Sequence, residues 1–379
     1  MADYNEGLYA VIAREVVTGH LPYVTAWEAK PPAFFALVAL AMAVFGVNFV
    51  AVHLLAVAAA VAIVLGVYAV GRAFAQDGVW IGRGAAVIAA AMLLSDSGTA
   101  VEGELLGSAF AAGAFAIAAD ALRPRSLSRS AAFWCGLLVS LIIGMKTTLL
   151  PVAIVAFAAA AYACTPAAIT AMCGGVLLPI VAQILPFVMA GRTSLLLDAN
   201  VWTVFRRFGV PLPHPSLSAV LRQQFEAFFP AWLFAVLVPA AARATSGERD
   251  RRIAAMCACW LLAALLSVAA IRLLCAWTAV RASQPSHVRT VVLALAAIAV
   301  IAHVPGRWLM LHEPDHAGRV AAYLNGLPAS ERTSLYLASN PGIYVLARAP
   351  IPTRFALPLR RTAAHFCATA GGRRCPAGD

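Results

Sequence analysis

Residues 49–71 read FVAVHLLAVAAAVAIVLGVYAVG and contain no Asp, Glu, Lys or Arg. A helix of roughly 17–25 apolar residues crosses a bilayer whose hydrocarbon core is about 30 Å thick, so this run is long enough to span a membrane. The whole chain of 379 residues is 62% hydrophobic and only 12% charged, whereas a soluble domain carries about 25% charged residues. The composition therefore predicts an all-α polytopic membrane protein.

Further apolar runs divide the chain into three regions. Candidate membrane segments lie at 33–46, 49–71, 84–95, 103–122, 131–145, 148–164, 168–190, 228–243, 253–271 and 288–304. The first is too short for a straight crossing, which favours a re-entrant or interfacial helix. We thus expect an N-terminal loop at 1–32, a transmembrane domain at 33–304 and a small soluble α/β region at 305–379, with a helix over 319–326 and a β-like run over 334–338.

The net charge of +11 indicates topology rather than nucleic-acid binding. Basic residues cluster between apolar runs near 72–83, 123–129 and 243–252, and such clusters mark the cytoplasmic side of a membrane. Basic and aromatic residues do not alternate as in a nucleic-acid surface.

The sidedness of the N-terminal residues depends on segment 33–46. If this segment does not cross the membrane, residues 1–30 and the loop 96–102 share the extracytoplasmic side; if it crosses, they lie on opposite sides. We favour the first arrangement, in a bacterial inner membrane, with the C-terminal region also extracytoplasmic.

The first 32 residues are polar, unlike the rest of the chain. Apolar residues recur with helical spacing over 6–18, which predicts an amphipathic helix that lies on the membrane surface and ends at Gly19. Asp3 and Glu6 have the spacing of a capping box, the structural alternative to a chemical role. Lys30 precedes Pro31 and Pro32 where the chain enters the membrane, where a lysine either snorkels or binds a lipid phosphate.

Several motifs resemble GT-C membrane glycosyltransferases of the family 39 type, which include aminoarabinose transferases and protein O-mannosyltransferases. DYNEGLYA at 3–10, GHLPY at 19–23 and WEAKPP at 27–32 resemble their first extracytoplasmic loop. Glu102 and Glu104 resemble a second acidic loop, Lys146 a lysine that ends a later helix, and NPGIY at 340–344 the soluble tail. The chain departs from the family at Leu8, where an arginine is common, and the acids Asp3 and Glu6 are not adjacent.

The resemblance implies transfer of a sugar from a polyprenyl-phosphate donor to a hydroxyl acceptor on the extracytoplasmic face, with inversion. Asp3 first and Glu6 second are the candidate general bases. The resemblance assigns the donor phosphate to Lys30 and Lys146, and orientation of the substrate to Glu104 and Tyr9. The expected partners are the lipid-linked sugar and membrane lipids, with no nucleic acid, and no cofactor or metal is indicated.

Other interpretations stay open. Glu104 near a helix start also fits a simple dipole interaction, and Lys146 also fits snorkelling. The family has a membrane helix before the acidic loop and none precedes it here, so an inactive, truncated transferase is one alternative. A transporter or flippase is another, although transporters place ionisable residues near the bilayer midplane.

Two further patterns at the C-terminal end of the chain carry less weight. HEPDH at 312–316 matches the zinc-protease pattern in letters, but Pro314 disfavours the helix that such a site needs. Cys367 and Cys375 would be able to form a disulfide if the tail is extracytoplasmic.

Overall fold

The computed structural model describes residues 4–73, 78–93, 100–122, 126–203, 316–328 and a few single positions between 252 and 346. The helices are α1 (Tyr4–Val17), α2 (Pro32–Phe45), α3 (Phe49–Arg72), α4 (Gly78–Leu93), α5 (Gly103–Ala121), α6 (Arg129–Met145), α7 (Leu150–Ala161), α8 (Pro166–Met189), α9 (Thr193–Leu197) and α15 (His316–Gly326). A 3₁₀ turn at Thr147–Leu149 precedes α7, and a π-helix at Asp198–Trp202 follows α9.

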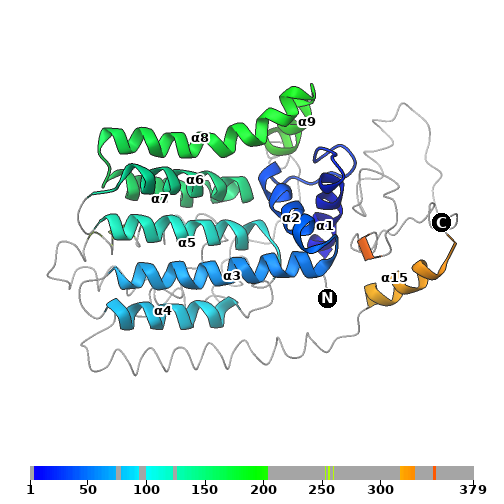
Figure 1. Ribbon diagram of the computed structural model, residues 1–379, viewed down its shortest axis with the longest axis horizontal. Coiled ribbons are helices and arrows are strands. Elements are labelled where there is room, and N and C mark those ends of the chain that lie inside the picture. The colour runs from blue at the N-terminus through cyan, green and yellow to red at the C-terminus, as the bar shows by residue number, and fades with distance from the viewer. Residues whose placement is uncertain are drawn as a thin grey trace, which may run out of the picture.

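Helices α3 to α8 lie side by side in an up-and-down bundle, and α1 and α2 cover one end of it (Figure 1). We call this end the α1 end. The first residues of α3 and α5 and the last residues of α6 and α8 lie there. The opposite end holds the last residue of α3, Arg72, and the first residue of α6, Arg129. The chain therefore brings distant segments together at two ends, and the two ends differ in charge.

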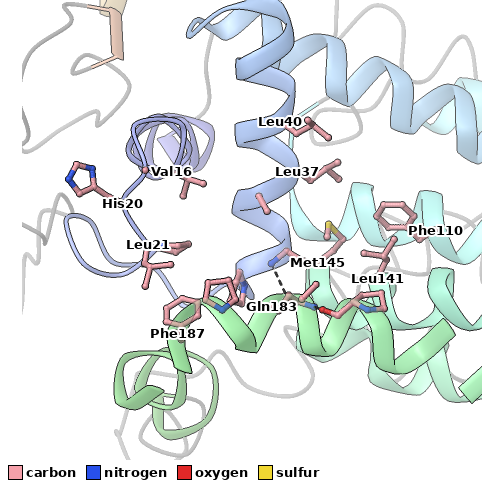
Figure 2. A pocket seen from close by; sticks show the side chains of 18 residues that line it. Val16, His20, Leu21, Leu37, Leu40, Phe110, Leu141, Met145, Gln183 and Phe187 are labelled. Carbon is pink, nitrogen blue, oxygen red and sulfur yellow. Dashed lines mark hydrogen bonds between the residues drawn. The ribbon is translucent and has the colours of Figure 1, made fainter. Parts of the chain in front are cut away.

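The predicted all-α membrane fold is confirmed for the described residues. Helices α3, α5 and α8 are long and apolar enough to cross a bilayer, while α2, α6 and the segment 147–161 are apolar but shorter. Helix α2 ends at Phe45, as predicted for the short run 33–46, and it runs across α8 rather than along it (Figure 2). The predicted segments at 228–243, 253–271 and 288–304 lie outside the described residues.

The N-terminal helix α1 and the C-terminal helix α15 both lie where the sequence predicts a helix. Helix α1 ends at Val17, and Gly19 adopts a φ of +92°, so the predicted stop of the helix at this glycine is confirmed. Burial of α1 goes further than the predicted one-sided face, because every residue from 6 to 13 is buried where α1 packs against α2 and α3. In the C-terminal region α15 confirms the predicted helix, whereas the β-like run at 334–338 lies outside the described residues.

Glycines allow neighbouring helices to approach backbone to backbone. A Cβ atom at Gly136 of α6 would come within 2.0 Å of the carbonyl oxygen of Met172 in α8, and one at Gly175 within 2.1 Å of the carbonyl oxygen of Phe133. In a membrane, where lipid tails are as apolar as side chains, such close packing of small residues holds helices together. The α6–α8 pair is therefore the most tightly joined contact of the bundle.

This contact yields a prediction about two adjacent glycines. Gly175→Ala forces a methyl group against the backbone of α6, and we expect a loss of about 1–3 kcal/mol of stability. Gly174→Ala is the matched control, because a Cβ there meets nothing within 4 Å. Thermal unfolding in detergent measures both variants. Equal melting temperatures for the two would contradict the proposed contact.

Candidate functional site

A cluster of charged side chains lies at the α1 end of the bundle. It draws on the start of α1, the residues before α2, the first turns of α3 and α5, and the residue after α6. Its members are Asn5, Glu6, Tyr9, Lys30, His53, Glu102, Glu104 and Lys146, and we call it the polar cluster.

Glu6 is the most deeply buried acid of the polar cluster, with 2% of its surface exposed. The backbone N–H of Val101 donates a hydrogen bond of 2.7 Å to Oε1 of Glu6. Nε2 of His53, on the second turn of α3, lies 3.6 Å from Oε2. A buried carboxylate needs such partners, because burial without them is costly. Glu6 therefore ties α1 to the segment before α5 and to α3.

Glu102 is held by a residue that is far from it in the sequence. The side-chain amide of Asn5 donates a hydrogen bond of 3.3 Å to Oε1 of Glu102. Burial and the neighbouring carboxylate of Glu104 raise the pKa of Glu102, and the hydrogen bond from Asn5 opposes this. A carboxyl whose pKa lies closer to neutrality is better suited to accept a proton in a reaction.

Glu104 and Lys146 form an ion pair between the start of α5 and the end of α6. The close approach depends on Gly103, since a Cβ atom there would lie 2.6 Å from the carbonyl oxygen of Met145. The second oxygen of Glu104, Oε2, is buried and has no hydrogen-bond partner among the residues that the structure describes. The pair thus leaves one carboxylate oxygen able to accept a hydrogen bond.

Lys30 is buried, with 8% of its surface exposed. Its Nζ lies 5.3 Å from the centre of the Tyr9 ring and 5.8 Å from that of Phe34, and these two rings meet edge to face. Burial lowers the pKa of the Lys30 ammonium below its usual value; Glu104 opposes this shift and Lys146 adds to it. Aromatic faces partly replace the water that the ammonium has lost.

The two lysines of the polar cluster are the only lysines in the chain. The other basic residues, 28 − 2 = 26, are arginines. Lysine carries a compact ammonium whose pKa shifts readily on burial, whereas arginine carries a planar guanidinium that stays charged. Counting lysines alone in the sequence would have pointed to both positions together.

An apolar pocket of about 620 Å³ adjoins the polar cluster. Side chains from α1, α2, α5, α6 and α8 line it, among them Leu37, Phe110, Leu141 and Phe187 (Figure 2). Two more lining residues, Pro32 and Met145, are close neighbours in the chain of Lys30 and Lys146. The pocket therefore borders the segments that carry the two lysines, although neither lysine lines it.

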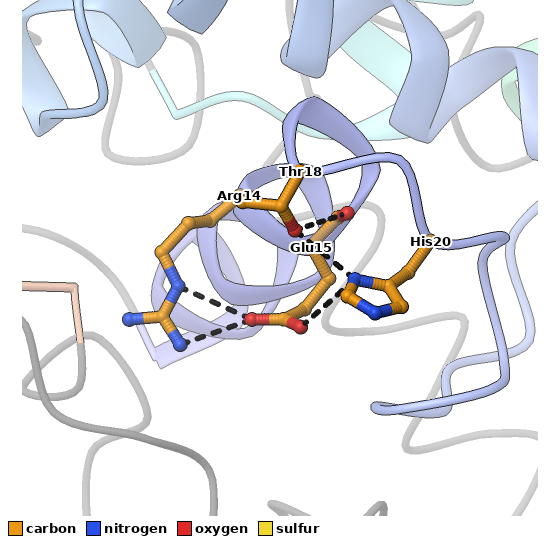
Figure 3. Close-up of polar contacts among 4 residues, drawn as sticks. All are labelled: Arg14, Glu15, Thr18 and His20. Carbon is orange, nitrogen blue, oxygen red and sulfur yellow. Dashed lines mark hydrogen bonds and ion pairs between the residues drawn. The ribbon is translucent and has the colours of Figure 1, made fainter.

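Two polar side chains, Gln183 and His20, line this otherwise apolar pocket. Oε1 of Gln183 accepts a hydrogen bond of 3.2 Å from the backbone N–H of Ala33. His20 lies at the margin, where its Nδ1 is 3.1 Å from Oγ1 of Thr18 and 3.7 Å from Glu15, which also binds Arg14 (Figure 3). These contacts hold the turn that follows α1, and with it the rim of the pocket.

The structure brings together most of the residues predicted from sequence. Glu6, Tyr9, Lys30, Glu104 and Lys146 all lie in the polar cluster, whereas Asp3 lies outside the described residues, and with it the predicted capping box. Their predicted chemical roles stay predictions. Sequence reasoning missed Asn5 and His53 as members of the cluster. Asn5 stands inside the quoted motif DYNEGLYA, so its position offered a signal, but His53 is one polar residue in an apolar run.

No metal site appears in the part of the chain that the structure describes. Within it, no group of three or more His, Cys, Asp or Glu side chains is placed to hold an ion. In the HEPDH pattern, His316 begins α15, and residues 312–315 lie outside the described residues, as do Cys367 and Cys375.

No protein-family model matches the chain, and no curated protein matches it in sequence. Among solved structures it is similar to the crystal structure of ArnT from Cupriavidus metallidurans bound to undecaprenyl phosphate. The fold resembles that of ArnT. The TM-score is 0.51, the identity is 15%, and the match covers 92% of this chain and 65% of the ArnT chain. The likeness confirms the predicted GT-C-like helical bundle as a fold, and the chain spans about two thirds of the length of the ArnT chain.

The Glu104–Lys146 pair can be tested by a double-mutant cycle. Glu104→Gln and Lys146→Met each leave one charge without its partner, so each should destabilise the protein more than the two together. We expect a coupling energy of about 1–2 kcal/mol from thermal unfolding. Strict additivity of the two changes would show that the ion pair does not contribute.

Glu102 gives a pH-dependent prediction. Because its pKa is raised in the folded state, the ionised carboxylate destabilises the fold at neutral pH, and the penalty disappears below the ordinary value of 4.5. Glu102→Gln should therefore raise the melting temperature at pH 7, by about 1 °C because solvent reaches the side chain, and have no effect below that value. A gain that persists at low pH would contradict the raised pKa.

Proposed function

We propose that the protein is a membrane glycosyltransferase that moves a sugar from a polyprenyl-phosphate donor to a hydroxyl acceptor on the extracytoplasmic face. One observation carries the proposal: both lysines of the chain meet in one polar cluster beside an apolar pocket. A polyprenyl phosphate has the matching two parts, an anionic head and an apolar chain. The crystal structure of ArnT with bound undecaprenyl phosphate supports a lipid of this kind.

The two lysines stabilise the leaving group in this proposal. The acceptor oxygen attacks the anomeric carbon, the bond from that carbon to the phosphate oxygen breaks, and its electron pair leaves with the lipid phosphate. Direct displacement inverts the anomeric centre. The phosphate carries more negative charge after the bond breaks, so a fixed ammonium such as Lys30 favours the transition state. Lys146 acts beside it, held in place by Glu104.

A carboxylate accepts the proton of the acceptor hydroxyl. Asp3 is the first candidate and Glu6 the second, and Glu102 is a third carboxylate of the same cluster. Glu6 is buried and bound by Val101 and His53, so a change there alters the fold of the site as well as its chemistry. Oε2 of Glu104 supplies an acceptor that suits a sugar hydroxyl, and Tyr9 orients substrate through the ammonium of Lys30 that rests on its ring.

The distribution of charge supports the proposed sidedness. Arg72 and Arg129 lie at the end of the bundle opposite the polar cluster, and basic residues favour the cytoplasmic side. The polar cluster would then face the extracytoplasmic space.

The charge distribution also favours an enzyme over a transporter. In the candidate spans α3, α5 and α8, charged side chains occur only in the terminal turns, at Arg72, Glu104 and Asp120. A translocation path would place such groups at mid-helix.

Sugar transfer from radiolabelled polyprenyl-phosphate donors tests the proposal in membranes that contain the protein. Lys30→Ala should lower transfer about 100-fold or more, because one fixed charge at the transition state is lost. Arg129→Gln, at the opposite end of the bundle, is the control and should leave transfer unchanged. Absence of transfer from every donor of a broad panel by the unaltered protein would favour the transporter alternative.

The same assay distinguishes the candidate bases. Asp3→Asn, Glu6→Gln and Glu102→Gln should be compared for transfer and for thermal stability. We expect Asp3→Asn to abolish transfer without loss of stability, and Glu6→Gln to lower both, since it breaks the pair with His53. Full activity of Asp3→Asn would exclude Asp3 as the base.

A further inference from the structure

Tyr23 has a backbone conformation that residues with a side chain rarely adopt. Its φ is +72°, and in the described part of the chain every other residue with positive φ is a glycine. Its side chain is fully buried, with 0% exposed. Strain of this kind persists only where surrounding contacts impose it, and it gathers at functional sites. The contacts of Tyr23 therefore indicate what the strained conformation serves.

The hydroxyl of Tyr23 joins two distant segments. It donates a hydrogen bond of 2.5 Å to the backbone carbonyl of Lys30, and it accepts one of 3.1 Å from the side-chain amide of Asn200. Asn200 belongs to the π-helix after α9 and also donates to the carbonyl of Leu196. The hydroxyl is thus fixed from one side and holds Lys30 on the other.

The backbone of Lys30 is restrained on both of its sides. Its N–H donates to the carbonyl of Glu28 at 2.9 Å, and its carbonyl accepts from Tyr23. The next two residues are Pro31 and Pro32, whose rings restrict the backbone. With the peptide units around Lys30 fixed in this way, the direction of the Lys30 side chain depends on the hydroxyl of Tyr23.

The ring of Tyr23 contacts the wall of the apolar pocket. It stacks on Phe187 with the ring centres 5.8 Å apart, and it meets Phe35 edge to face at 6.0 Å. Phe187 and the residue before Tyr23, Pro22, both line the pocket. One side chain therefore touches the pocket wall with its ring and the backbone of Lys30 with its hydroxyl.

We propose that Tyr23 is a positioning residue, which, held by Asn200 and Phe187, sets the ammonium of Lys30 in the polar cluster beside the apolar pocket. The ligand that this arrangement serves, an apolar chain with a phosphate head, rests on the proposed function. The position of Lys30 itself is a property of the protein without ligand, so it can be measured separately.

The experiment uses the fact that the chain has two lysines. Reductive methylation of the purified full-length protein, followed by mass spectrometry, gives the labelling rates of Lys30 and Lys146 separately. Tyr23→Phe keeps the ring and removes the hydroxyl. At a pH above the ordinary pKa of lysine, where both amines are neutral and the rate reports access alone, labelling of Lys30 should become about fivefold faster, the factor that corresponds to one net hydrogen bond, while labelling of Lys146 stays unchanged. Asn200→Ala should act in the same direction, and Tyr68→Phe in α3, away from the polar cluster, is the control.

Two results would overturn the positioning role. One is an unchanged rate at Lys30 in Tyr23→Phe. The other is an equal increase at Lys30 and Lys146, which would show general loosening of the fold. The pH at which labelling of Lys30 is half-maximal gives a second readout and should move up toward that of an ordinary lysine, since burial lowers the pKa of Lys30 in the intact site.

A second arm separates this inference from the proposed function. Undecaprenyl phosphate should protect Lys30 of the unaltered protein from labelling, and undecaprenol, which lacks the phosphate, should not. If both lipids or neither protect, the proposed donor site is wrong, while the ligand-free comparison of Tyr23→Phe still decides the role of Tyr23. If the phosphate protects the unaltered protein but not Tyr23→Phe, both proposals are supported.

Discussion

Charged side chains that have lost most of their contact with water are the constraint on which the α1 end of the bundle depends. An unpaired charge removed from water costs several kcal/mol, so each one needs a partner held in place. Glu6 has a backbone N–H and a histidine, Glu104 has Lys146, and the ammonium of Lys30 rests on two aromatic rings. These partners come from segments that are far apart in the sequence, and satisfying them fixes how α1, α2, α5 and α6 meet.

The helices could be predicted from the sequence because length and hydropathy are local properties. The runs at 49–71 and 103–122 match α3 and α5 to within a residue or two, and Gly19 ends α1 where a positive φ is needed. Most residues of the site were also visible as motifs, but His53 was not, because it is one polar residue in an apolar run. Their pairing was not, because Glu104 and Lys146 are 42 positions apart and Tyr23 and Asn200 are 177 apart. Such contacts depend on how helices are rotated and shifted against one another, which no local pattern encodes.

The two kinds of basic residue in the bundle have different surroundings. Arg72 and Arg129 lie at the end away from the polar cluster, and Arg14, at the same end as the lysines, is paired with Glu15 outside the cluster. Lysine is confined to the polar cluster, where the charge is buried and its pKa is shifted. An arginine would fit the space between the two aromatic rings differently, because its guanidinium is planar and spreads its charge over several donors, whereas the ammonium of lysine is a compact charge.

The backbone contact between α6 and α8 also decides which wall of the apolar pocket is the most rigid. The backbones of α6 and α8 are in contact at Gly136 and Gly175, so neither helix can slide along the other without a steric clash. Helix α2 meets α8 through side-chain contacts and the hydrogen bond from the backbone N–H of Ala33 to Gln183, without such a backbone-to-backbone contact. The α6–α8 wall is therefore the part of the pocket whose shape is set by the backbone, whereas the α2 wall is set by side chains that can change rotamer.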